Sequence, residues 1–162
     1  MLRTIKFIFF AIVLIYIQIL LMPHLAIASV IPNIIIGFVI FLALYSNINL
    51  ALTISFFTGL AYDLMYPSTL GLNTMLFLLI CLIVSKTHQS INKERIIAVL
   101  FSLFIVNIIY WLIIVIFRAM DMGVLAALFS GVLWAAVYNT IITLIVIYFF
   151  VLLEKVRIYV GN

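Results

Sequence analysis

The sequence predicts an all-α polytopic membrane protein, in which six transmembrane helices form one bundle with both ends in the cytoplasm. Hydrophobic residues make up 70% of the 162 residues and charged residues only 7%, whereas about 25% of residues are charged in soluble domains. Lys and Arg residues stay on the cytoplasmic side of a membrane. Seven of the eight Lys and Arg residues in this chain lie in three short polar breaks of the apolar sequence. An even number of crossings therefore separates each pair of breaks. The seven basic residues are Arg3, Lys6, Lys86, Lys93, Arg95, Lys155 and Arg157.

Six apolar segments supply the crossings, and most approach the roughly 20 residues that a spanning helix needs. The first begins after Arg3 and Lys6; a cleavable signal peptide is the alternative there, but its removal would leave an odd number of crossings. We expect one domain, residues 1–162. Its helices are expected at about residues 7–22, 32–46, 48–64, 70–85, 96–117 and 134–153.

Turn residues separate the first four helices. Pro32 is expected to open the second helix, because proline lacks a backbone donor and suits a first helical turn. Four crossings then return the chain to the basic segment 86–95, as the charge pattern requires. The turns are Pro23-His24, Ser46-Asn47-Ile48-Asn49 and Tyr66-Pro67-Ser68.

The last apolar run is too long for one crossing. Residues 124–153 would extend about 45 Å as a helix, against a hydrocarbon core of about 30 Å. We therefore expect a break at Ser130-Gly131, with a short interfacial helix at about residues 123–131 before the final crossing. Arg118, the basic residue left outside, lies near Asp121 and is expected to pair with it.

Asp63 is the only acidic residue next to the core of an apolar run, at the outer end of the third helix. Carboxylates at a membrane are costly and suggest function, and a helix C-terminus disfavours negative charge. We favour a structural role, in which the carboxylate accepts backbone N–H groups of the turn 66–69 or of the start of the fourth helix. A substrate or proton site is the alternative.

Small and amide residues mark expected contacts between helices. Gly59 lies one turn before Asp63, and Ser55 one turn before Gly59, so another helix can approach this face closely. Ala127 and Gly131 form a second small-residue face, and either face is a candidate for a partner helix. Gly71 is expected in a tight turn into the fourth helix. The amides Asn33, Asn73, Asn107 and Asn139 are expected to form interhelical hydrogen bonds.

The sequence contains no pattern of catalytic or cofactor-binding residues. His24 and His88 have no carboxylate or cysteine at metal-ligand spacing, and Cys81 is the single cysteine. Nucleophile–base sets and glycine-rich phosphate loops are absent. The net charge of +4 comes from the cytoplasmic edges and suits anionic lipid headgroups rather than nucleic acid. We expect no enzyme activity, cofactor or metal.

Three motifs resemble the family of the rod shape-determining protein MreD. The segment from Gly59 to Gly71 reads GLAYDLMYPSTLG and is similar to the family's G-x-x-x-D-L stretch, short turn and L-G. Pro32-Asn33 resembles the P-N that opens the family's second helix, and Tyr138-Asn139 resembles the Y-N of its last helix. Ile31 departs from the pattern, since many members have a basic residue before P-N.

The resemblance implies a multi-pass protein of the bacterial inner membrane, with a fold similar to the six-helix substrate-binding components of energy-coupling-factor transporters. It implies a non-catalytic scaffold of the cell-elongation machinery that supports cell shape and lateral peptidoglycan synthesis. The implied partners are MreC, whose single membrane helix leads to an extracytoplasmic domain, and the actin-like MreB, RodA and a class B penicillin-binding protein. Membrane lipids are the remaining expected contact.

Two other functions stay open. The shared fold suggests a vitamin-type substrate-binding component of a transporter, for which Asp63, Asn73 and Asn107 are a small set of ligand groups. The alanines four residues apart that such components use for docking do not occur in this chain. An intramembrane enzyme is the third hypothesis. Round cells, vitamin auxotrophy or accumulated lipid substrate after depletion would distinguish the three.

Overall fold

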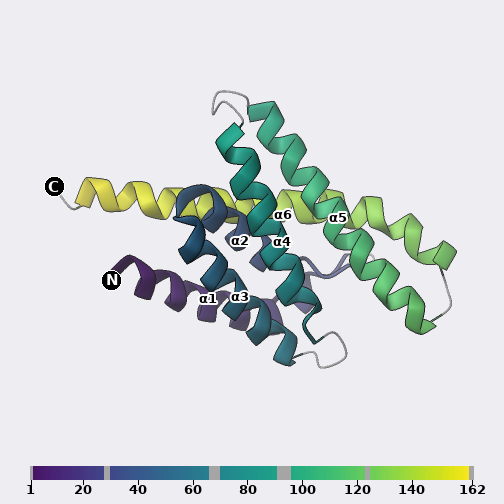
Figure 1. Ribbon diagram of the computed structural model, residues 1–162. Helices are drawn as coiled ribbons and strands as arrows, with labels where there is room; N and C mark the ends of the chain where they lie inside the picture. Colours follow the sequence, from purple (N-terminus) through teal and green to yellow (C-terminus); the bar gives the residue numbers. More distant parts are fainter. Residues whose placement is uncertain (1, 28–29, 66–69, 91–95, 123–124, 161–162) are drawn as a thin grey trace.

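The computed structural model describes residues 2–27, 30–65, 70–90, 96–122 and 125–160. Over these residues the chain is all-helical, with six α-helices and one short 3₁₀ turn (Figure 1). The prediction of an all-α fold with six helices is confirmed. The elements are α1 (Leu2–Leu20), η1 (Met22–Leu25), α2 (Ile34–Tyr45), α3 (Ile48–Met65), α4 (Leu72–Ser90), α5 (Ile96–Met122) and α6 (Leu125–Val160).

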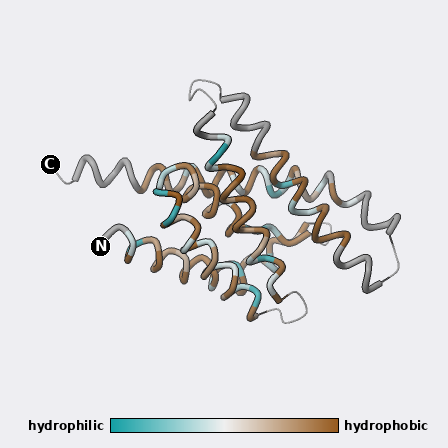
Figure 2. The backbone as a smooth tube through the Cα atoms, in the orientation of Figure 1, coloured by the Kyte–Doolittle hydropathy of each residue, from teal (hydrophilic) through white to brown (hydrophobic). Residues whose placement is uncertain are grey.

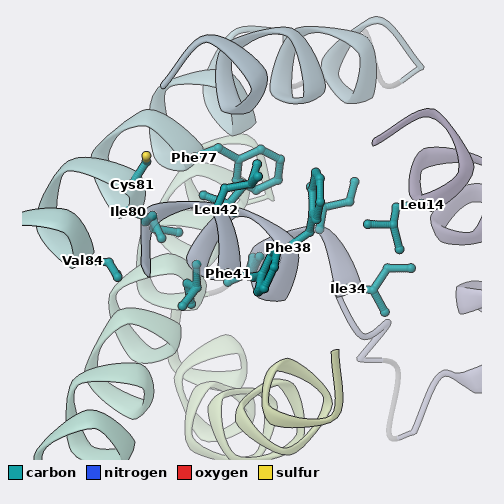
Figure 3. Close-up of a cluster of buried hydrophobic side chains, with 14 of the residues drawn as sticks. Leu14, Ile34, Phe38, Phe41, Leu42, Phe77, Ile80, Cys81 and Val84 are labelled. Atoms are coloured by element: carbon teal, nitrogen blue, oxygen red, sulfur yellow. The ribbon is translucent and has the colours of Figure 1, made fainter. Parts of the chain in front are cut away.

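Helix α2 is the centre of the fold. Every residue from Ile34 to Ala43 is buried, which is the expected place for a helix that is apolar on all sides. Helices α1, α3, α4 and α6 pack around it. Figure 3 shows Phe38, Phe41 and Leu42 of α2 among side chains of the neighbouring helices. Burial of these large side chains holds the other helices around α2.

The start of α2 lies two residues later than expected. Asn33 has an extended backbone, with φ −109° and ψ 97°, and its side chain accepts a hydrogen bond from the N–H of Ile35 at 3.0 Å. It is therefore the N-cap, a role in which asparagine is among the preferred residues. Pro32 is buried in the extended segment before the helix, and it does not form the first helical turn.

Helix α6 corrects a second expectation. It runs without interruption from Leu125 to Val160, so no break occurs at Ser130-Gly131 and no separate interfacial helix ends at residue 131. Residues 123–124 lie outside the described part of the chain. A glycine inside a helix costs only about 1 kcal/mol relative to alanine, and packing against α5 accompanies the continuous helix.

Aromatic rings join three helices at the end of the bundle opposite the start of α2. The ring of Phe150 from α6 lies 5.3 Å from that of Phe10 in α1 and 5.1 Å from that of Phe41 in α2. Phe7 packs edge-on against Phe41 at 6.2 Å. We call these four residues the aromatic cluster. Phe7 and Phe10 lie in the first half of α1, Phe41 lies near the end of α2, and Phe150 lies ten residues before the end of α6, so these parts of the three helices share one level.

The outer surface is strongly apolar. Hydrophobic residues are common in the coloured parts of the helices in Figure 2, and large side chains such as Phe57, Leu64 and Tyr148 are more than half exposed. In the described residues, two helical segments are long and apolar enough to cross a membrane, Ile48–Met65 and Trp134–Leu153. Shorter apolar segments occur in the other four α-helices. A surface of this kind suits contact with lipid tails.

Candidate functional site

The Asp63 carboxylate lies fully buried in the last turn of α3, two residues before its end, and binds the first turn of α4. Oδ1 accepts hydrogen bonds from the backbone N–H and the side-chain amide of Asn73, at 3.1 and 2.9 Å. Oδ2 accepts from the backbone N–H and the hydroxyl of Thr74, at 2.9 and 2.7 Å. One of the two expected sets of donors is thus used, while the turn 66–69 lies outside the described residues.

This contact stabilises both helices. The first N–H groups of a helix have no partner within it, and the N-terminal end of its dipole attracts a negative charge. Asp63 therefore caps α4 from a different helix. The partial positive charge at the start of α4 also compensates the carboxylate for its unfavourable position near the C-terminus of α3.

Two glycines allow the approach. Gly71, just before α4, has a φ of +88°, a conformation that strongly favours glycine. A Cβ added to Gly59 would lie 2.6 Å from the Cα of Thr74, so α3 and α4 touch there with no room for a side chain. Gly59 and Ser55 are both buried. The expected close approach thus occurs within the chain, and this face is not free for a partner helix.

The amide of Asn73 extends the contact to the other helices. Its Oδ1 accepts a hydrogen bond from the hydroxyl of Tyr110 in α5, at 2.9 Å. The same hydroxyl accepts from the side-chain amide of Asn33, at 2.8 Å. The backbone N–H of Asn33 in turn donates to Oδ1 of Asn139 in α6, at 2.7 Å. All four residues are at least nine-tenths buried.

Helix α1 joins through Gln18, whose amide holds the backbone on both sides of Asn33. Its Nε2 donates to the carbonyl of Pro32, and its Oε1 accepts from the N–H of Ile34, both at 2.9 Å. Every one of the six α-helices thus contributes or holds a member of one polar cluster. We call Gln18, Asn33, Asp63, Asn73, Thr74, Tyr110 and Asn139 the polar network.

Tyr138 holds the connection between α1 and α2 from a second point. Its hydroxyl donates to the carbonyl of Leu25 at 2.7 Å, while the neighbouring Asn139 binds Asn33. The two residues of the Y-N motif therefore fix the two ends of the segment that leads into α2. The P-N, Y-N and G-x-x-x-D-L motifs, far apart in the sequence, meet at the polar network.

A family model described as rod shape-determining protein MreD matches residues 1–156. The chain belongs to the MreD family. Membership makes it a membrane protein with a role in rod-shape determination. No curated protein and no solved structure matches the chain.

Two candidates lie outside the network of this MreD-family protein. Asn107 is fully buried in α5, but the bond of its amide nitrogen goes to the carbonyl of Leu103 in the same helix, at 3.0 Å. That bond lies within α5, so it is not the interhelical bond that we expected for Asn107. Ser55 is fully buried on the α4-facing side of α3 and takes no part in the network.

Three network members were not anticipated from the sequence, Gln18, Thr74 and Tyr110; for Thr74, only its region, the start of the fourth helix, was expected to bind Asp63. Gln18 carries the one recognisable signal, because it is the only strongly polar residue between Lys6 and Pro23. Tyr110 carries none, since tyrosine is common in membrane helices near the interface.

The chemistry of the network is that of a structural joint. Its donors and acceptors bind one another, and the Asp63 carboxylate is enclosed by four hydrogen bonds. Among the described residues, no group of three His, Cys, Asp or Glu side chains could hold a metal ion. The arrangement can fix helix positions in a poorly hydrated region, where each unsatisfied polar group is costly.

Proposed function

We propose that this chain is a non-catalytic scaffold of the bacterial inner membrane, which supports rod shape and lateral peptidoglycan synthesis by binding an MreC-like single-span protein. MreB, RodA and a class B penicillin-binding protein join it through the same complex. Membership of the MreD family supports the role in rod shape. The observation that carries the scaffold proposal is the polar network, because it commits the polar groups at the centre of the bundle to holding six helices together.

We propose that all six helices cross the membrane and that both ends lie in the cytoplasm. The polar network joins the ends of α1 and α3 to the starts of α2 and α4, and the aromatic cluster joins the first half of α1 to the end of α2. In the described residues, α1 and α2 therefore run in opposite directions, and so do α3 and α4. The ammonium of Lys6 lies 5.5 Å from the ring centre of Phe10 in the aromatic cluster, which supports a cytoplasmic position for that end.

Exposed tyrosine and tryptophan side chains agree with this placement. Tyr16 and Trp134 lie toward the network end of α1 and α6, and Tyr45 and Tyr148 lie toward the opposite end of α2 and α6; all four are exposed. Such residues gather at the two membrane–water interfaces. The similarity to energy-coupling-factor substrate-binding components remains part of the proposal and rests on the family resemblance.

The transporter alternative is less well supported by the site. Asp63 accepts from Asn73 and Thr74, and the side-chain oxygen of Asn73 accepts from Tyr110, so these groups are already occupied. Asn107, the third candidate ligand, is fully buried against its neighbours. A vitamin ligand needs convergent polar groups in an accessible pocket, and these three do not provide them.

Depletion of the chain in its host tests the proposed function. Rounded cells with normal vitamin uptake would support the scaffold, and re-expression of the wild-type chain should restore rods. Rod-shaped cells that require an added vitamin would instead favour the transporter. The scaffold proposal also predicts that the tagged chain co-purifies with the host's MreC-like protein from mild detergent, whereas an unrelated six-span protein with the same tag does not.

A further inference from the structure

The connection between α1 and α2, residues 21–33, has an apolar outer side. Its described residues are non-helical apart from the short turn η1. Leu21 is 55%, Leu25 51% and Ile27 48% exposed. Among the described side chains of the connection, His24 is the only exposed polar one. Large apolar side chains that stand together on a surface indicate contact with another apolar phase.

The connection between α2 and α3 has the opposite composition. It consists of Ser46 and Asn47, and Asn47 is exposed together with Asn49 in the first turn of α3. Exposed amide groups suit contact with water, because polar groups lose free energy when they leave it. The apolar outer side of residues 21–33 is therefore a feature of that segment, and it calls for its own explanation.

Helix lengths indicate the depth of the connection between α1 and α2. Helix α2 has 12 residues and a length of about 18 Å, whereas the hydrocarbon of a bilayer is about 30 Å thick. In α1, Lys6, which belongs at the cytoplasmic boundary, lies 14 residues before Leu20, a rise of about 21 Å. Tilt shortens both rises further. The connection, which lies away from the start of α1 and the end of α6 in Figure 1, is therefore within about 10 Å of the outer boundary, on its hydrocarbon side.

The backbone of the connection is suited to this depth, where an unpaired N–H or C=O group is costly. Ile27 and Val30 exchange two hydrogen bonds, in which the N–H of each residue donates to the carbonyl of the other, at 3.1 and 2.9 Å. The N–H of Ala26 donates to the carbonyl of Pro23 at 3.3 Å, and Pro23 itself has no N–H. These bonds allow a non-helical segment to remain in a poorly hydrated region.

Side chains of α1 and α6 hold the inner side of the connection against the bundle. The hydroxyl of Tyr138 donates to the carbonyl of Leu25 at 2.7 Å, and Nε2 of Gln18 donates to the carbonyl of Pro32 at 2.9 Å. Val30 and Pro32 are buried. The connection thus has one side fixed to the protein and one apolar side that faces outward.

We propose that residues 21–33 insert into the outer leaflet of the membrane, where Leu21, Leu25 and Ile27 contact the upper part of the phospholipid acyl chains. The depth, the apolar outer side and the paired backbone together favour lipid over a protein partner. Amphipathic segments that lie in a membrane interface bury their apolar side to a similar depth, about 5–10 Å. The inference rests on the proposed orientation with both ends in the cytoplasm, and it is independent of the proposed binding of an MreC-like protein.

Spin labels on the purified full-length chain test the insertion. The chain, in a Cys81→Ser background, is reconstituted without partners into vesicles of phosphatidylethanolamine and phosphatidylglycerol. A nitroxide is attached at Leu25→Cys or Ile27→Cys, with Phe57→Cys in the middle of α3, 62% exposed, as the lipid control and Asn47→Cys as the water control. We expect collisions with a water-soluble nickel chelate to be about fivefold rarer at positions 25 and 27 than at position 47, because water is absent from the hydrocarbon. Collisions with oxygen should match those at position 57.

A charged side chain provides a second test in cells. Ile27→Asp should lower the abundance of the chain in the membrane by about threefold or more, because a carboxylate in lipid is costly. The matched variant Asn47→Asp, in the polar connection, should leave the abundance unchanged. Equal abundance of the two variants would contradict the insertion.

The spin-label results separate the possible failures. Nickel collisions at positions 25 and 27 as frequent as at position 47 would show that the connection lies in water. Exclusion of both nickel and oxygen would show that protein, such as a second copy of the chain, covers it. Either result overturns the insertion and leaves the proposed function standing. If a membrane-impermeant maleimide labels Ser90→Cys from outside intact cells, the proposed orientation is wrong, and the assignment to the outer leaflet fails with it.

Discussion

Asn33 and Asn139 are 106 residues apart in the chain, yet the backbone N–H of Asn33 donates to the side-chain oxygen of Asn139 at 2.7 Å. This bond connects the cap of the central helix with the middle of the last one. Asn33 also caps α2 through its own oxygen and binds Tyr110 through its amide nitrogen. A single buried asparagine thus fixes where α2 begins and how α5 and α6 sit against it.

Asp63 should be sensitive even to an isosteric change. Each carboxylate oxygen accepts one backbone N–H, from Asn73 or from Thr74. Asp63→Asn replaces one acceptor by an NH₂ group, and Asp63→Ala removes both. With about 1–3 kcal/mol for each buried donor left without a partner, stability should fall in the order Asp, Asn, Ala. Thermal unfolding of the purified chain in detergent measures this order. An asparagine variant as stable as wild type would contradict the two-oxygen cap.

Tyr110→Phe tests whether the link between α5 and the other helices depends on the hydroxyl. The variant keeps the ring, which stacks on Phe77 at 6.4 Å, but Asn73 and Asn33 each lose a buried partner. We expect a loss of about 1–3 kcal/mol. Tyr138→Phe is the matched control, because its hydroxyl bond to Leu25 is exposed and should matter less. Equal unfolding temperatures for the two variants would argue against a stabilising role of the network at Tyr110.

Glycine-to-alanine changes at Gly59 and Gly131 compare a close contact between two helices with an uncovered helix face. Gly59→Ala places a methyl group 2.6 Å from the Cα of Thr74, so α4 must move, and Asp63 would then lose its alignment with the start of α4. Gly131→Ala meets no atom within 4 Å and should stabilise the chain by up to about 1 kcal/mol through helix propensity. The unfolding midpoints of both variants in detergent measure the contrast. A stable Gly59→Ala protein would mean that α3 and α4 are not closely packed.

Much of the fold could be predicted because its signals are local. Apolar runs of helical length and the turn residues between them indicated six helices, and Asp63 stood out as a charge beside an apolar run. The N-cap of α2 shows the limit: Pro32 suits a first turn, but the side chain of Asn33 binds Ile35 and moves the start to Ile34. The continuity of α6 was missed for a similar reason. Ser130 and Gly131 weaken a helix locally, but neither residue indicates that α6 packs against α5.

The site depended on information that a single sequence does not contain. Gln18 and Tyr110 enter the network only because α1 and α5 lie beside the start of α2, and nothing in their own segments indicates that neighbour. Gly59 illustrates the same limit, since a small-residue face looks alike whether it meets a helix of the same chain or a partner. In the structure, the Gly59 face of α3 packs against α4, whereas Gly131 is uncovered.

The proposed six crossings predict opposite accessibility for two connections. Ser68 follows α3, whose end lies at the polar network, and Ser90 ends α4 at the basic segment 86–95. Lys and Arg remain in the cytoplasm, so Ser90→Cys should be shielded in intact cells and Ser68→Cys accessible from outside. A Cys81→Ser background removes the single native thiol, which is buried in α4. A membrane-impermeant maleimide should therefore label Ser68→Cys in intact cells, and Ser90→Cys only after the membrane is opened. Labelling of Ser90→Cys alone from outside would show that the orientation in the membrane is the opposite of the one proposed. Labelling of both positions from the same side would show that α4 does not cross the membrane.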